Sequence, residues 1–219
     1  MKRRIAFIDF ELSGDELRQV LAGMQRFNDY VHGLGLDEIT AEYIGNLLDI
    51  NKEAGLEGDE YLPLTQQNGT VSYWKTIGYF CCGIHRKNRI GYYDFLVAIN
   101  RKIVDTPSDV WHTKARNGES YGGHNSFDCG SAETITTFPL NGILDTRNKE
   151  RYLDYIIRHE LGHTLIPLKD LPEDATDCAM KPVRFATDEY LAVKNVEYTP
   201  EQVRAIRTNI AKFNLDTMK

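Results

Sequence analysis

The sequence predicts a protein of the α+β class, because patterns typical of strands and patterns typical of amphipathic helices both occur in it. Residues 4–10 and 92–99 are short runs rich in Ile, Phe, Val and Tyr, as strands are. Residues 17–31 and 152–161 instead repeat apolar residues every three or four positions, the period of a helix with one buried face. With 219 residues, 42% of them hydrophobic, the chain is long enough for one well-packed domain, and we expect a single domain over residues 1–219.

The first predicted strand leads directly into a helix that has a strong start signal. Ser13 and Glu16 have the spacing of a capping box, in which each side chain bonds the other residue's backbone N–H. Gly33 and Gly35 are typical of a helix end. We therefore expect a helix whose buried stripe is made of Leu17, Val20, Leu21, Met24, Phe27 and Val31.

The next segment continues the helical spacing and then changes period. A second helix is predicted from the spacing of Ile39, Tyr43, Ile44, Leu47 and Leu48. Residues 70–80 and 92–99 then carry Val, Ile, Tyr, Trp and Phe in short runs on either side of a polar turn at 85–88. We expect both runs to be strands.

The middle of the chain is predicted to be a long surface loop, followed by one more strand. Residues 106–131 are polar and rich in glycine. Residues 133–140 include Ile135 and Phe138 and read as a strand that comes directly before the next helix.

The most informative motif is His-Glu-Leu-Gly-His at residues 159–163. The four-residue spacing puts His159 and His163 on one face of a helix. Two neutral imidazoles on one face can hold Zn²⁺ at about 2.0–2.1 Å per nitrogen and leave a coordination position for water. Glu160, beside the first imidazole, is the expected general base that takes the proton of that water. Apolar residues at helical spacing give this helix a buried face: Tyr152, Leu153, Ile156, Ile157 and Leu161.

The C-terminal part is predicted to close the fold with a further helix. Thr199 is a suitable N-cap, and Pro200 suits the first helical position because its fixed backbone angle is already helical. Val203, Ile206 and Ile210 follow at helical spacing.

Composition and charge exclude several classes of protein. The net charge of -6 argues against a nucleic-acid partner, which would need a basic stripe. No apolar run approaches the roughly 20 residues that span a bilayer, so we expect no membrane association. Asp9 and Glu11 interrupt the apolar run after the basic N-terminus, so we expect no secretory signal and a cytoplasmic protein. The few, irregularly spaced cysteines do not form a disulfide framework, and Cys81, Cys82 and Cys129 are expected to be packing residues.

Taken together, these residues resemble the metzincin metallopeptidases, and within them most closely the archaemetzincins. The His-Glu-Leu-Gly-His helix, the strand expected before it at 133–140 and the closing helix after Thr199 all have counterparts in that family. Residues 177–180, Asp-Cys-Ala-Met, look like the family's Met-turn, whose methionine lies beneath the zinc.

The resemblance implies a zincin fold in which a twisted mixed sheet packs on helices around an active-site helix. An upper subdomain would cover about residues 1–165, and a smaller C-terminal subdomain about 166–219. It also implies a zinc peptidase that takes a peptide or protein substrate along the edge strand, here 133–140. We expect such a protein to be a monomer.

The chain departs from the family pattern after the second histidine. Ile166 and Lys169 occupy the positions where the family has a glycine and the third metal ligand. Pro167 pushes Ile166 out of helical space and ends the helix there. A protonated lysine cannot bind zinc, so we expect Asp170, one position later, to be the third ligand. The alternatives are Asp174, Asp177 and Glu189.

Two further readings follow from these departures. The family's second zinc, held by four cysteines, is not expected, because only Cys178 matches and no cysteine follows it. A single catalytic zinc is therefore predicted.

The altered third ligand also leaves two other functions open. One is a non-catalytic protein of the same fold that binds peptides or proteins, and the other is a zinc hydrolase with another substrate. The presence of Glu160 favours the enzyme, because a structural zinc would not need a base beside it.

Overall fold

The structure is a computed structural model of the chain, in which strands and helices alternate as far as α2, and the later described strands are followed by the last helices. It describes residues 3–10, 12–53, 71–72, 93–99, 103–104, 135–139, 144, 146–165, 171–172, 174–182 and 187–216. In chain order the elements are β1 (Arg3–Phe10), α1 (Gly14–Gly33), β2 (Ile39–Asn46), α2 (Leu47–Glu53), β3 (Val71–Ser72), β4 (Tyr93–Ile99), β5 (Ile103–Val104), β6 (Ile135–Pro139), α4 (Lys149–Leu165), α5 (Asp188–Val193) and α6 (Pro200–Asp216).

A four-stranded sheet with the order β2-β1-β4-β6 forms the centre of the described structure. Every pairing in it is parallel, and Ile5 of β1 lies opposite Ala41 of β2 on one side and Asp94 of β4 on the other. The predicted strands at 4–10, 92–99 and 133–140 are thus confirmed. The mixed sheet that the resemblance implied is not found among the described strands, whose short second sheet, β3 with β5, is also parallel.

The predicted helix at 39–48 is wrong over most of its length, because residues 39–46 form strand β2. Ile39 and Ala41 point into the core with the alternation of a strand. One edge of β2 pairs with β1, and on the other side the Asn28 side chain bonds both the N–H and the C=O of Ala41, at 2.8 and 2.9 Å. These long-range bonds outweigh the local helical spacing. Only the segment from Leu47 is helical, as α2.

Helix α1 begins and ends as the sequence predicted. Ser13 Oγ accepts from the Glu16 N–H and Glu16 Oε2 accepts from the Ser13 N–H, which completes the capping box. At the other end Gly35 has a φ of 67°, and the Leu36 N–H bonds the Val31 carbonyl at 2.9 Å. This is a Schellman motif, which needs a left-handed residue where Gly35 lies.

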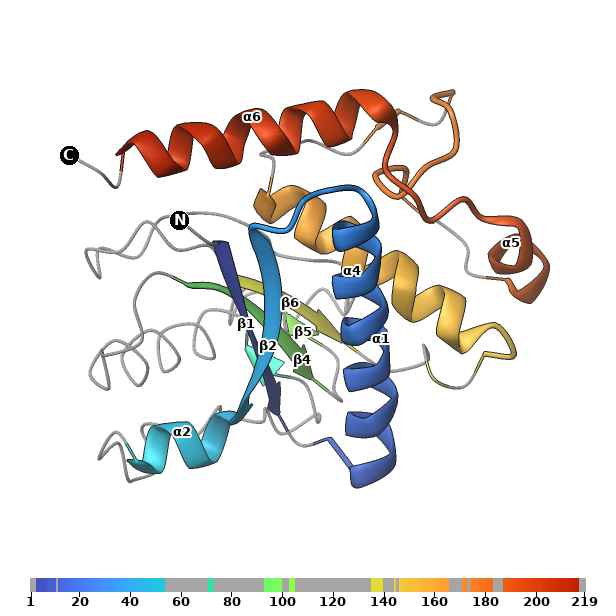
Figure 1. Cartoon of the computed structure of the whole chain (residues 1–219). Helices are drawn as coiled ribbons and strands as arrows, with labels where there is room; N and C mark the ends of the chain where they lie inside the picture. The colour runs from blue at the N-terminus through green and yellow to red at the C-terminus, as the bar shows by residue number, and fades with distance from the viewer. Residues whose placement is uncertain are drawn as a thin grey trace.

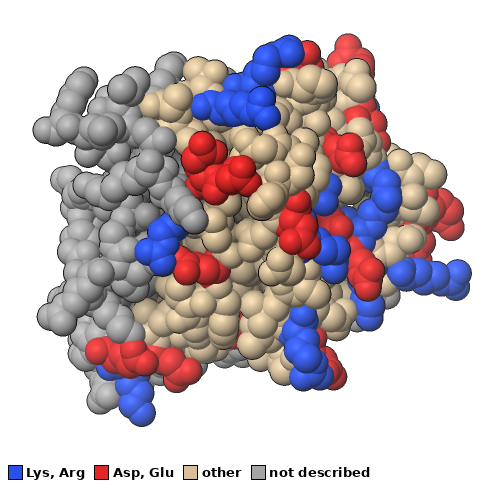
Figure 2. Space-filling view, viewed as in Figure 1, with Lys and Arg blue, Asp and Glu red and all other residues tan. Residues whose placement is uncertain are grey.

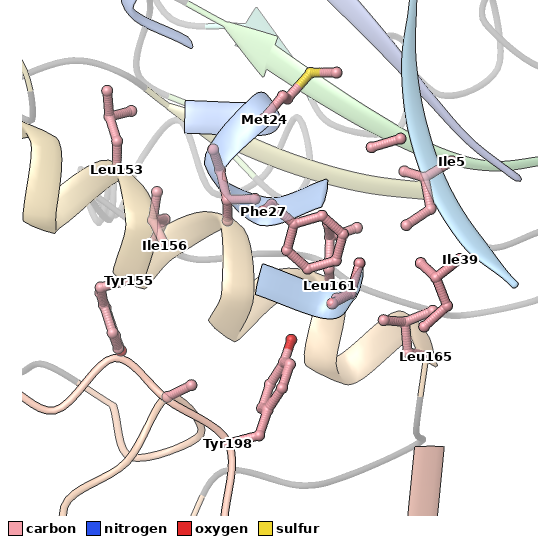
Figure 3. Packing of buried hydrophobic residues seen from close by; sticks show 14 of the residues in the cluster. Ile5, Met24, Phe27, Ile39, Leu153, Tyr155, Ile156, Leu161, Leu165 and Tyr198 are labelled. Atoms are coloured by element: carbon pink, nitrogen blue, oxygen red, sulfur yellow. The ribbon is translucent and has the colours of Figure 1, made fainter. Parts of the chain in front are cut away.

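Helices α1 and α4 pack against each other, and both contribute residues to the hydrophobic core (Figure 1). Gly23 of α1 lets them approach closely, since a Cβ there would lie 3.0 Å from Ile157 Cδ1. Figure 3 shows Phe27 of α1 and Leu161 of α4 in the same hydrophobic cluster as Ile5 of β1. The motif helix is therefore part of the main hydrophobic core.

Helix α6 lies across the top of the view in Figure 1. Two hydrogen bonds attach it to the end of α4 and to the residue after α1. Asn209 Nδ2 donates to the carbonyl of Leu165 at the end of α4, and Arg207 donates to the Leu34 carbonyl after α1. Its start carries the predicted cap, in which Thr199 and Gln202 exchange bonds. None of the helices in the described ranges is long and apolar enough to cross a membrane.

The surface shown in Figure 2 carries charges of both signs. Lys and Arg side chains lie among Asp and Glu side chains over the described part of this face. Among the described residues, Arg26 forms an ion pair with Asp154 at 2.7 Å. The described part of this face therefore presents no stripe of a single sign.

Candidate active site

Helix α4 carries the first two residues of the predicted motif into the protein interior. His159 is 5% exposed and Glu160 is 1% exposed, although both are polar. They lie on a helix whose apolar residues Ile156, Ile157 and Leu161 anchor it in the core. Burying an imidazole and a carboxylate is costly unless specific partners or a function compensate for the lost hydration. The environment of each is therefore informative.

The imidazole of His159 has a defined orientation. Its Nδ1 lies 2.8 Å from the backbone carbonyl oxygen of Ala179, and its ring centroid lies 5.2 Å from that of Tyr155. A carbonyl oxygen can only accept, so Nδ1 carries the proton and donates it. In the neutral ring Nε2 is then the nitrogen that carries the lone pair. In this tautomer Nε2, and not Nδ1, is the nitrogen that can coordinate a metal ion.

Residues Cys178–Met180, here called the Cys178–Met180 turn, lie directly against the motif helix. All three are completely buried, and the turn is closed by a bond from the Lys181 N–H to the Cys178 carbonyl at 3.1 Å. A Cβ at Gly162 would overlap the Met180 sulfur and lie 3.3 Å from Tyr198 Cε1. Only a glycine fits there with Met180 in this position, so the segment compared with a Met-turn does lie beside the motif.

A buried lysine, which the sequence did not reveal, supports this turn. Lys194 is completely buried, and its Nζ donates to the Cys178 carbonyl at 2.6 Å and to Asp177 Oδ1 at 2.5 Å. Lysine side chains are seldom fully buried unless they are paired, so the local sequence gives no reason to expect that this lysine is buried.

A second group of contacts holds the start of the motif. The Tyr198 hydroxyl donates to the Arg158 carbonyl at 2.5 Å, and the Arg158 guanidinium lies 3.8 Å from the centre of the Tyr30 ring. Burial raises the pKa of Tyr198 far above its usual value, so its hydroxyl stays protonated and remains a donor. In Figure 3 Tyr198 points from the C-terminal segment toward α4.

The other predicted site residues are only partly within the described structure. His163 lies in α4, but its side chain is outside the described residues, and Asp170 is wholly outside them. Asp174 is exposed, as is Glu189 on α5. Among the described side chains, which do not include those of His163 and Asp170, no group of three or more His, Cys, Asp or Glu could hold a metal.

Cys178 is the only cysteine within the described ranges. Its thiol is free and completely buried, and Gln202 Nε2 donates to the sulfur at 3.6 Å. Cys81, Cys82 and Cys129 lie outside the described residues, so their predicted packing role stays a prediction.

Asp177, one of the alternative metal ligands, is already bonded through both carboxylate oxygens. Oδ1 accepts from Lys194 and Oδ2 accepts from the Asn195 N–H at 2.7 Å. Burial by itself would raise the pKa of Asp177, but the Asn195 N–H and the Lys194 ammonium outweigh burial and lower it below its ordinary value of 3.8. The carboxylate form is therefore the one that the fold stabilises.

This lowered pKa predicts a pH dependence of stability. A depressed folded-state pKa stabilises the protein above the unfolded-state value, about 3.9 for Asp, and the gain is lost as the pH falls through the folded-state pKa. We expect the free energy of unfolding to fall more steeply below about pH 4 in the wild type than in Asp177→Asn, which has no carboxyl to titrate there. Urea unfolding at a series of acidic pH values would measure this, and parallel curves would contradict it.

Comparison with known proteins identifies the fold. No family model and no curated protein matches the sequence. Among solved structures, the archaemetzincin from Methanopyrus kandleri has a TM-score of 0.58 and 14% identity, with 96% of each chain covered. A zinc-dependent peptidase from Methanocorpusculum labreanum has a TM-score of 0.54 and 12% identity, over 93% of this chain and 99% of that one.

A second archaemetzincin, from Archaeoglobus fulgidus, gives a TM-score of 0.51 and 12% identity, over 92% of this chain and 99% of its own. At such low identity these likenesses speak for the fold alone. The resemblance predicted from the residues is confirmed at that level: the chain has the archaemetzincin fold.

Proposed function

We propose that the protein is a zinc-dependent peptidase in which His159, His163 and Asp170 bind a single zinc ion and Glu160 is the general base. One observation carries the proposal: the bond between His159 Nδ1 and the Ala179 carbonyl, which makes Nε2 the lone-pair nitrogen of a neutral, buried imidazole. Metal-binding histidines usually donate their other ring N–H in this way. The likeness to a zinc-dependent peptidase and to two archaemetzincins supports the same conclusion.

The chemistry of the donor set fits a catalytic zinc. Two imidazoles and one carboxylate form a set that leaves a position open for water. Asp170 is favoured as the carboxylate over Asp177, whose oxygens are bonded to Lys194 and to the Asn195 N–H. A zinc ion held there would act as a Lewis acid, lowering the pKa of a bound water to about 7 and polarising the scissile carbonyl.

The remaining steps belong to residues of the chain. Glu160, next to His159 on α4, would accept the proton of the attacking water on a carboxylate oxygen and return it to the leaving amine nitrogen. Its burial lowers the local dielectric and so strengthens its interaction with charge that develops nearby.

The substrate is proposed to be a peptide or an extended segment of a protein. β6 is the last strand in the described sheet order, and α4 contacts it. A peptide that adds to β6 as a further strand would therefore pass beside the motif helix. Such binding uses main-chain hydrogen bonds, which select an extended backbone more than particular side chains. In this proposal residues 1–165 and 166–219 are the approximate upper and lower subdomains around the substrate.

Metal analysis tests the proposed ligands. Purified wild-type protein should contain a single zinc ion per chain, Asp170→Ala should lose most of it, and Asp174→Ala, a matched change in the same segment, should keep it. A peptide-library assay with the wild type should then detect hydrolysis. Absence of zinc after zinc addition would refute the peptidase and favour a non-catalytic binding protein. Loss of zinc in Asp174→Ala alone would move the third ligand to that residue.

A further inference from the structure

We propose that Lys194 is a positioning residue for His159: its buried ammonium fixes the Cys178–Met180 turn so that the Ala179 carbonyl holds the imidazole in its Nδ1–H tautomer. The consequence for zinc binding rests on the proposed function. The effect on the tautomer does not, because it is a property of the metal-free protein.

The ammonium of Lys194 has partners on several sides. Nζ donates to Asp177 Oδ1 and to the Cys178 carbonyl, and it lies 5.2 Å from the centre of the Tyr155 ring. An ammonium has three protons to donate and is attracted to the face of an aromatic ring. A completely buried lysine with these partners is held firmly in place.

The link from Lys194 to His159 runs through one peptide group. The peptide between Cys178 and Ala179 is bonded at both ends, its carbonyl by Lys194 and its N–H by the Glu197 carbonyl at 2.8 Å. Because a peptide group is planar, bonds at both ends fix its orientation. The next carbonyl, that of Ala179, is then directed at His159 Nδ1.

The ring of Tyr155 connects the same two residues. It lies 5.2 Å from Lys194 Nζ and 5.2 Å, between ring centroids, from His159. The Tyr155 hydroxyl also donates to the Lys181 carbonyl at 3.2 Å, just beyond the Cys178–Met180 turn. Both the ammonium and the imidazole are therefore packed against one ring that is itself attached to the turn.

This arrangement has a chemical consequence that general packing would not have. A neutral imidazole can carry its proton on either nitrogen, and the partner of one nitrogen decides which form prevails. If the Ala179 carbonyl is no longer directed at Nδ1, the Nε2–H tautomer becomes available to His159. That tautomer has no lone pair on Nε2, so it cannot bind a metal through this nitrogen.

The test compares Lys194→Met with Lys181→Met. The first change removes the ammonium but keeps an unbranched side chain, and Asp177, whose side chain is 37% exposed, still has the Asn195 N–H and solvent as partners. The second makes the same replacement in the same region, at a lysine whose Nζ donates to the Ala175 carbonyl at 2.9 Å.

The readout is the pair of imidazole ¹⁵N chemical shifts of His159 in metal-free protein, assigned by their loss in His159→Gln. The wild type and Lys181→Met should show the Nδ1–H tautomer, whereas Lys194→Met should show a substantial Nε2–H fraction. By chelator competition, zinc affinity should fall about 10–100-fold in Lys194→Met, the size of effect usual for a group that orients a metal ligand.

An unchanged tautomer in folded Lys194→Met would overturn the positioning role, even if the wild type binds zinc. A shifted tautomer in a protein that binds no zinc would refute the proposed function and leave the positioning role intact. If Lys194→Met does not fold, the double variant Asp177→Asn/Lys194→Met removes both charges, a replacement that proteins often tolerate. If the positioning role is correct, this double variant should also show a substantial Nε2–H fraction of His159.

Discussion

Glu160→Gln should lose nearly all peptide hydrolysis while keeping its zinc. Glutamine has the size and shape of glutamate, so the buried position of residue 160 is preserved. Its neutral amide cannot take up the proton of the attacking water. A positioned general base contributes about 10²–10⁴-fold to a rate, and kcat/KM should fall by that amount. Hydrolysis of a peptide found in the library assay, measured together with zinc content, gives the result.

The control for this prediction lies on the same helix. Glu150 is exposed in the first turn of α4, and Glu150→Gln makes the same chemical change away from the motif. It should leave both hydrolysis and zinc content at wild-type values. Full activity in Glu160→Gln would remove Glu160 from the role of base. Loss of zinc in that variant would mean instead that the carboxylate supports the metal site.

Helix boundaries could be predicted from the sequence where a few neighbouring residues determine them. The capping box of Ser13 and Glu16 and the left-handed Gly35 act within a single turn of α1. The bonds between Thr199 and Gln202 at the start of α6 are equally local. Such signals do not depend on the rest of the fold, so they can be recognised in the sequence alone.

Strand β2 shows where this approach fails. The spacing of Ile39, Tyr43 and Leu47 is compatible with a helix. The segment is a strand because β1 pairs with one edge of it and Asn28 bonds the backbone of Ala41. Both partners lie earlier in the chain and become neighbours only when α1 folds back on the sheet. Tertiary contacts of this kind override local spacing.

The features of the candidate site also divide into those that the sequence could predict and those that depend on the fold. His159 and Glu160 could be identified because their spacing in a helix carries chemical meaning. The orientation of His159 could not, because it depends on the Ala179 carbonyl, and every residue has a carbonyl. Lys194 was missed for a related reason: in sequence it is an ordinary charged residue after a short helix, and only the fold buries it.

Gly162→Ala should destabilise the protein, although alanine usually stabilises a helix. A glycine inside a helix costs about 0.5–1 kcal/mol relative to alanine, so without other contacts the change would be favourable. At Gly162, however, the added Cβ would overlap the Met180 sulfur and lie 3.1 Å from Met180 Cε. Overpacking a close-packed core costs about 1–3 kcal/mol, and the free energy of unfolding should fall by about that amount.

The matched control is Gly33→Ala, at the last residue of α1. No atom lies within 4 Å of a Cβ at Gly33, so that variant should be as stable as the wild type or slightly more stable. Urea unfolding of the two variants measures the difference. Equal stability of Gly162→Ala and Gly33→Ala would show that Met180 does not lie against the motif helix in the way described.

A double-mutant cycle separates the steric clash from other effects of the substitution. Met180→Ala alone should cost about 2–5 kcal/mol, because it leaves a cavity in a fully buried position. In Gly162→Ala/Met180→Ala the new methyl group occupies part of that cavity, so the double variant should be less destabilised than the sum of the two single variants. Additive values would mean that the two side chains do not share the same space.

The same clash would displace the Cys178–Met180 turn and with it the Ala179 carbonyl. Gly162→Ala should therefore also weaken zinc binding, whereas Gly33→Ala should not.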